Sequence, residues 1–190
     1  MRGWGDESGS QSRLDPGAYV LATALVTSPA DLDVIRLGMQ SLRPPGAKKV
    51  HWKDDDSRRH RLVVELMLDL PFAALVVVRV GTVTDRHERR RRKCLEELLP
   101  RLGNAGCEEL TLESRGQADD RKDRDMHNYL RRAHRLTTPL HLNHLPGPAE
   151  PALWAADALC GAVASARCGE PEHLKRLEAR IAIEVVEISV

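Results

Sequence analysis

The feature that most constrains the fold is a pair of long apolar runs, rich in β-branched residues, at residues 18–27 and 72–80. Neither run alternates regularly between apolar and polar residues, so a strand formed from either one is expected to be buried on both faces. A sheet with such strands needs helices packed against both sides. The two runs therefore indicate an α/β protein.

Helix-like and strand-like segments alternate along the rest of the sequence, without an internal repeat or a linker-like change in composition. The length of 190 residues is typical of one domain, which we place at residues 1–190. A short strand ending at Asp6 comes first, and a helix at 84–101 is expected to end near Pro100. The remaining segments are predicted helices at 29–40, 55–69, 121–135, 150–167 and 171–183, and predicted strands at 108–113 and 137–143, with a short strand at the end of the chain.

Composition and charge exclude several classes of function. No apolar stretch approaches the roughly 20 residues that span a bilayer, and the N-terminus lacks a signal-peptide pattern, so we expect a cytoplasmic protein without a membrane segment. The four cysteines have no CxxC spacing and are predicted to be free thiols rather than zinc ligands. A net charge of +1 gives no general case for nucleic-acid binding, and an aromatic content of 3% argues against binding single strands by base stacking.

Two adjacent acids, Asp6 and Glu7, stand at the end of the first strand and are followed by Ser8 and Gly9. A strand this short and flanked by glycine contributes little packing at a sheet edge, so we expect it in the middle of the sheet, where it presents a side chain. Successive strand residues point to opposite faces, which directs Glu7 away from Asp6. Asp6 is the main candidate here, and Glu7 and Ser8 are secondary ones.

A second candidate acid, Glu113, is the last residue of the predicted strand at 108–113. Strand alternation places Leu110 and Leu112 on one face and Glu113 on the other. The carboxyl end of a strand is where open α/β sheets bind ligands. The alternative is that Glu113 belongs to the exposed polar face of an edge strand.

The third candidate, Asp157, is the only charged residue between Glu150 and Arg167 and lies within an apolar helix. The residues three and four positions away are packing residues, so the carboxylate shares their face. Buried charges are normally paired or bound to metal. The alternatives are a salt bridge to an arginine or a position on the rim of an otherwise apolar helix. Gly161 one turn further on leaves room for a group to approach.

Three carboxylates from separate elements suit a hard divalent cation such as Mg²⁺ or Mn²⁺. Two such ions, about 3.5 to 4 Å apart, can hold both the attacking and the leaving oxygen in phosphodiester cleavage. The sequence has no histidine or cysteine cluster of the kind that binds zinc or iron, and no GxxxxGK[ST] phosphate loop.

The DESG motif at residues 6–9, the strand-end acid Glu113 and the Ala-Asp helix motif at 153–159 together resemble a family: the DESG-headed bacterial proteins of unknown function assigned to the ribonuclease-H-like superfamily, which are predicted nucleases. The short piece at 49–51 is similar to another family feature. The resemblance spans nearly the whole chain. Two features depart from it: glycines interrupt the strand before Asp6, and residues 144–148 read HLPGP where relatives often have serine and lysine.

The resemblance implies a ribonuclease-H-like fold, a mixed five-stranded sheet with helices on both faces. In that fold the acids of the first and fourth strands lie side by side, and the acid of the late helix reaches across to them, as in Holliday-junction resolvases. Carried over to this sequence, Asp6 would bridge the metal ions, and Glu113 and Asp157 would complete the ligand set.

His51 and Asp120 are secondary candidates. His51 could orient a phosphate or a water, or it could be a packing or surface residue. Asp120 could support the ligands from outside, or it could belong to a solvated polar loop. The arginines at 89–92 could contact phosphates, but at most two of them share one helix face, and pairing with nearby glutamates accounts for them equally well.

The leading hypothesis is a magnesium-dependent nuclease that acts on nucleic acid of unknown type. The first alternative is a catalytically weak ribonuclease-H-like module that binds nucleic acid or a partner protein. The second is a phosphotransfer enzyme that uses the same carboxylates. A chain of this length leaves little room for a recognition domain, so a homodimer or a partner protein could supply specificity.

Overall fold

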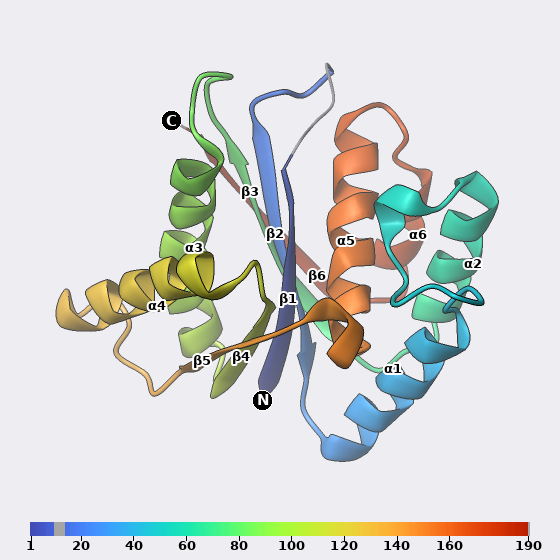
Figure 1. Cartoon of the computed structure of the whole chain (residues 1–190), viewed down its shortest axis with the longest axis horizontal. Helices are drawn as coiled ribbons and strands as arrows, with labels where there is room; N and C mark the ends of the chain where they lie inside the picture. Colours follow the sequence, from blue (N-terminus) through green and yellow to red (C-terminus); the bar gives the residue numbers. More distant parts are fainter. Residues whose placement is uncertain (10–13, 190) are drawn as a thin grey trace.

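A computed structural model, which describes residues 1–9 and 14–189, shows one mixed sheet between two layers of helices (Figure 1). The strand order is β5-β4-β1-β2-β3-β6. β1 and β3 each run antiparallel to β2, β4 and β5 run parallel to β1, and β6 runs parallel to β3. The strands are β1 (Arg2–Gly9), β2 (Ala18–Val26), β3 (Ala73–Val80), β4 (Glu109–Glu113), β5 (His141–Leu145) and β6 (Ile183–Ser189).

The helices divide between the two faces of the sheet, as Figure 1 shows. One face packs against α1 (Pro29–Ser41), α2 (Ser57–Met67), α5 (Ala152–Arg167) and α6 (Glu172–Glu178). The other face packs against α3 (His87–Asn104) and α4 (Gln117–Arg132). Two short 3₁₀ turns, η1 (Trp52–Asp54) and η2 (Gly147–Ala149), lie in the loops before α2 and α5.

The central strand β2 explains why the sheet is covered on both sides. All nine of its residues are buried, and they alternate between two cores. Val20, Ala22 and Ala24 pack in the core under α1, α2 and α5, whereas Tyr19 and Leu21 pack in the core under α3. The prediction of a strand buried on both faces is confirmed.

Strand β1 lies in the middle of the sheet, between β4 and β2, as expected. It is longer than expected, however, and its glycines do not interrupt it. A Cβ atom added to Gly3 would lie 2.8 Å from Cγ2 of Thr23, and one added to Gly5 would lie 2.7 Å from Cδ2 of Leu112. The two glycines therefore allow the neighbouring side chains to pack closely over the strand, and the prediction of a broken strand was wrong.

Two further predictions need correction. Helix α3 does not end near Pro100 but continues to Asn104, because Leu99 and Leu102 are fully buried against the sheet and this packing outweighs the cost of a proline inside a helix, about 3 kcal/mol. The sheet also has six strands rather than five, because β6 extends it beyond β3. No helix among the described residues is both long and apolar enough to cross a membrane.

Candidate active site

The first two candidate acids, Asp6 and Glu113, are neighbours on adjacent parallel strands. The register of β1 and β4 pairs Gly5 with Leu112, so the next residue of each strand brings Asp6 beside Glu113. Leu112 packs in the core under α3, and strand alternation therefore turns Glu113 to the face that α5 covers. After burial, the charge of Glu113 is the largest cause that raises the pKa of Asp6, and a hydrogen bond between the two side chains adds to it.

Asp157 reaches the same place from α5, which packs against β1 and β2. Its side chain is buried, and each of its two oxygens has a partner. Oδ2 accepts a hydrogen bond of 2.7 Å from the backbone N–H of Trp52, and Oδ1 lies 3.1 Å from Nδ1 of His51. The Cys160 thiol donates to the backbone carbonyl of Asp6 at 3.1 Å, so this turn of α5 is fixed directly against β1.

The space beside Gly161 is filled by an indole ring rather than by a ligand. A Cβ atom at Gly161 would lie 2.1 Å from Cγ of Trp52. The glycine thus lets Trp52 pack onto α5, and this packing places the Trp52 N–H against Asp157. The space expected beside Gly161 exists, but the Trp52 side chain occupies it.

Lys49 is a site residue that the sequence analysis missed. Its Nζ atom donates to both oxygens of Glu113, at 2.6 and 2.8 Å. In the segment at 49–51, Val50 is buried in the core, while Lys49 and His51 both reach the carboxylates. The available signal was this alternation of two basic residues around a buried valine, but the segment is too short for the pattern to be distinctive.

The charges of these groups act on one another. The pKa of Asp6 is well above its usual value. Burial is the largest cause, although Asp6 is not fully buried, and the charges of Glu113 and Asp157 raise the pKa further. Burial would lower the pKa of Lys49, but its hydrogen bonds and the three carboxylates raise it above the usual value. The hydrogen bond to Asp157 is the largest cause that raises the pKa of His51. These five groups form one electrostatic cluster.

A pocket of about 440 Å³ opens beside this cluster. Ser8, on the same face of β1 as Asp6, lines it together with His51 and Asp157. The other lining residues come from the end of β1, from η1 and from α5 and the loop after it: Glu7, Gly9, Trp52, Lys53, Gly161, Ala164, Ser165, Cys168 and Glu170. Of the three main candidate acids, Asp157 lines this volume, which could admit part of a substrate.

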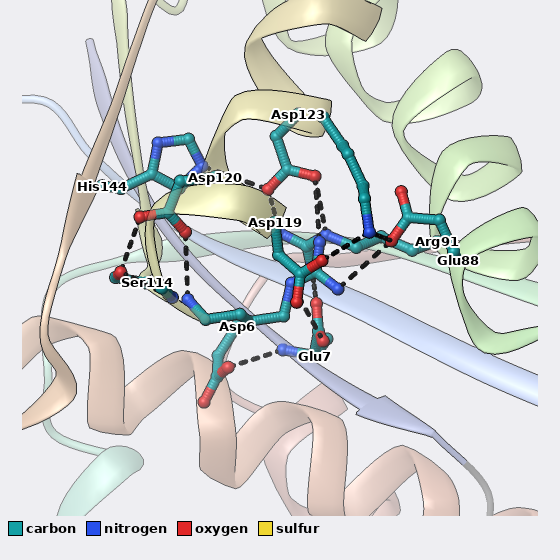
Figure 2. A network of polar contacts seen from close by, with 12 residues as sticks. Asp6, Glu7, Glu88, Arg91, Ser114, Asp119, Asp120, Asp123 and His144 are labelled. Atoms are coloured by element: carbon teal, nitrogen blue, oxygen red, sulfur yellow. Dashed lines mark hydrogen bonds and ion pairs between the residues drawn. The ribbon is translucent and has the colours of Figure 1, made fainter.

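Glu7 belongs to a different network, on the opposite face of the sheet (Figure 2). Its carboxylate pairs with Arg91 and lies 3.6 Å from Nε of Arg115. Arg91 also donates to both oxygens of Asp123, at 2.9 and 2.6 Å, and Nε2 of His144 lies 3.0 Å from Asp123. In Figure 2 the Asp6 carboxyl points away from the Glu7 carboxylate and accepts a hydrogen bond of 2.7 Å from the Glu7 backbone N–H. Glu7 is therefore separated from the other candidate acids.

The Asp123 carboxylate is held in its charged form. Burial would raise its pKa, but hydrogen bonds from Arg91 and His144 and the charges of Arg91 and Arg115 keep it well below the usual value. With Arg91 and Asp123 both buried, this network ties α3 and α4 to the sheet.

Asp120 supports the loop that follows Glu113. It accepts a hydrogen bond of 2.6 Å from Oγ of Ser114 and one of 3.0 Å from the backbone N–H of Arg115. Its side chain is buried, so the idea of a solvated polar loop was wrong at this position. Asp120 acts on the site only through the backbone that carries Glu113.

The arginine run at 89–92 is not one phosphate-binding face. Arg90 is buried and donates to the carbonyl oxygens of Pro16 and Thr82, both at 2.9 Å. Arg91 is held by the carboxylates described above. These two arginines stabilise loops and helices, which leaves only their exposed neighbours for other contacts.

Within the described residues, no group of three or more His, Cys, Asp or Glu side chains is arranged to hold a metal ion as it stands. The reason lies in the partners: Glu113 is engaged by Lys49, and Asp157 by His51 and Trp52. The donor chemistry is nevertheless that of a hard cation, because three carboxylates converge. Burial and the charges of Glu113 and Asp157 raise the pKa of Asp6, and a bound divalent ion would oppose this shift by favouring the ionised carboxylate. These residues fit a divalent ion, and its binding stays a prediction.

No protein-family model and no curated protein matches the sequence. Among solved structures, the chain is similar to a chain of the PCNA:RNase HII complex from Archaeoglobus fulgidus, with a TM-score of 0.52 and 14% identity over 96% of this chain and 78% of that one. The fold is ribonuclease-H-like. A second similarity is to Bst-RNase HIII in complex with Mn²⁺, with a TM-score of 0.41 and 17% identity over 94% of this chain and 54% of that one. The ribonuclease-H-like fold implied by the sequence resemblance is confirmed, apart from the additional strand β6.

Proposed function

We propose that the protein is a metal-dependent nuclease in which Asp6, Glu113 and Asp157 bind Mg²⁺ or Mn²⁺ for the hydrolysis of a phosphodiester bond. The observation that carries the proposal is the meeting of three acids from β1, β4 and α5 in a ribonuclease-H-like fold, beside an open pocket. The similarity to a structure that contains an RNase HII supports nucleic acid as the substrate. Membership in the DESG-headed family is part of the same proposal, and a homodimer or a partner protein that supplies specificity stays a prediction.

In this proposal the residues divide the work between binding and positioning. Asp6 is the central ligand, because both other acids act on it. Lys49 and His51 each hold one of the two outer carboxylates, and the Trp52 N–H fixes the second oxygen of Asp157. A bound divalent ion would stabilise charge on the phosphoryl group and lower the pKa of a water molecule. Ser8 and His51 face the pocket where the substrate would lie.

The second candidate function is a catalytically weak module that binds nucleic acid or a partner protein. The observation that favours it is the engagement of Glu113 by Lys49, together with the lack of a preformed metal-binding group in the described part of the chain. If no ion binds beside Lys49, the acids would contribute charge but no chemistry.

One experiment separates the two functions. Labelled RNA, DNA and branched DNA are incubated with the protein and Mg²⁺ or Mn²⁺, beside Asp6→Asn and Asp157→Asn, with Asp69→Asn as the matched control because Asp69 is exposed. Cleavage by the unaltered protein and the control, but by neither site variant, is the expected result. Cleavage that survives both site substitutions would reject the assigned site. Binding without any cleavage would favour the module.

A further inference from the structure

Lys49 contacts Glu113 in the way that a cation is held by a carboxylate. Its ammonium group lies 2.6 and 2.8 Å from the two oxygens, so it binds Glu113 bidentately. The charges of Asp6 and Asp157 also act on it. Both side chains of the pair are mostly shielded from solvent, with 19% exposed in each. The ammonium is thus held by Glu113 in a mostly shielded position, where the charges of the other two acids also act on it.

The structure holds Lys49 in this place from both sides. The next residue, Val50, is buried in the core, and Trp52 packs into the space beside Gly161. Glu113 is restrained as well, because a Cβ atom at Gly147 would lie 2.5 to 2.6 Å from its carboxyl atoms. A lysine with so little freedom is a fixed part of the charge distribution, unlike a mobile surface lysine.

Counting charges shows what such a lysine does. With His51 neutral, the three ionised acids carry three negative charges, Lys49 cancels one of them, and a single divalent ion cancels the remaining two. A second divalent ion would leave the cluster with an excess of two positive charges. An ammonium group can neutralise charge and donate hydrogen bonds to a phosphate oxygen, although it cannot activate water as a metal ion does.

We propose that Lys49 is a built-in second cation, so that this chain binds one divalent ion where two-ion nucleases bind two. The proposal rests on the proposed function, since it assigns the metal stoichiometry of the same site. Lys49 takes over the charge-neutralising part of the second ion's role, and the three carboxylates share the one ion.

The test counts bound Mn²⁺ by isothermal titration calorimetry and by electron paramagnetic resonance of the free ion, without any substrate. The variants are Lys49→Met, Lys49→Arg and, as matched control, Lys48→Met, because Lys48 is the exposed neighbour. We expect one ion per chain for the unaltered protein, for Lys49→Arg and for Lys48→Met, and two for Lys49→Met. Circular dichroism checks that each variant folds.

Two ions bound by the unaltered protein would overturn the proposal, and this count is decisive even if Lys49→Met does not fold. Two other results would also overturn it while leaving a metal site in place. One is a folded Lys49→Met variant that still binds one ion. The other is an unaltered protein that binds no ion together with a variant that binds one. If neither the unaltered protein nor any variant binds Mn²⁺, the proposed metal-dependent function itself is wrong. The failures of the two proposals are therefore distinguishable.

Discussion

The two faces of β1 carry two acid clusters with opposite electrostatics. On one face Asp6 meets two further acids, and its pKa is held well above the usual value by burial and by their charges. On the other face Glu7 and Asp123 share the buried Arg91, and the arginines and His144 keep the pKa of Asp123 well below the usual value despite burial.

This difference separates the candidate site from a structural cluster. Both faces hold buried or partly buried carboxylates, so the number of acids does not distinguish them. The neighbours of the acids do: arginines pair with Glu7 and Asp123, whereas burial and the charges of two further acids raise the pKa of Asp6. Groups with perturbed pKa values concentrate at functional sites. If the two faces differ in this way, substitutions on the Asp6 face should affect activity, and substitutions on the Glu7 face should affect stability.

The largest expected effect is the loss of activity in Asp6→Asn. We expect cleavage to fall roughly 10³-fold, because a bound divalent ion contributes several kcal/mol of transition-state stabilisation. The free energy of unfolding should stay equal or rise, since the substitution removes a carboxyl group that burial disfavours in its charged form. Cleavage rates and urea unfolding measure the two properties. A variant that loses stability together with activity would contradict the contrast between the faces.

On the other face, Arg91→Met should destabilise the fold by about 3–5 kcal/mol, because it leaves Glu7 and Asp123 buried without their cation. The matched control is Arg92→Met: Arg92 is the exposed neighbour, and its loss should change stability by less than about 0.5 kcal/mol. Urea denaturation of both variants gives the comparison. Equal losses in the two would show that the buried ion pairs do not stabilise the structure.

A smaller effect is expected for Glu7→Gln, which removes one charge from the same network but keeps its shape. The free energy of unfolding should fall by about 1–3 kcal/mol, since a buried polar partner is lost, while the cleavage rate per folded molecule stays unchanged. The measurement is the specific activity after correction for the folded fraction. A loss of activity like that of Asp6→Asn would place Glu7 in the site after all.

The smallest effect is the pH dependence contributed by Asp123. Its pKa is lowered in the folded state, so its stabilisation is fully present above the unfolded value of 3.8 and is lost as the pH falls below it. We expect it to account for a loss of about 1 kcal/mol between pH 7 and pH 3. Urea unfolding at both pH values should show a shallower decline in Asp123→Asn than in the unaltered protein, and identical declines would mean that Asp123 does not hold its charge in this way.

The sequence predicted the positions of the acids well, because each depends on a regular element. Strand alternation separated Asp6 from Glu7 and turned Glu113 away from Leu110 and Leu112, and the apolar context of Asp157 pointed to the core. The structure brings these three acids together, while their role as metal ligands stays a prediction. The strand β6 at the end of the chain was expected, but its place as a sixth strand beside β3 was not.

The groups that balance the acids could not be found in the same way. Lys49 lies in a short irregular segment, where no periodicity indicates which side chain turns inward, and its partner is 64 residues away in the sequence. The network around Arg91 was missed because a run of arginines on a helix looks solvated. Only the packing of α3 and α4 shows that Arg90 and Arg91 are buried.

The glycines of β1 have a consequence for the fidelity of folding. Gly3 and Gly5 stand where only a hydrogen atom fits beside Thr23 and Leu112, and Trp4 lies between them. If β1 paired one residue out of register, every side chain would change face, and the indole of Trp4 would have to enter a space that cannot hold a methyl group. Such a slip would also exchange the two acids, turning Glu7 toward Lys49 and Asp6 toward Arg91. The two smallest residues of the strand therefore exclude the misfolded arrangement in which the wrong carboxylate occupies the site.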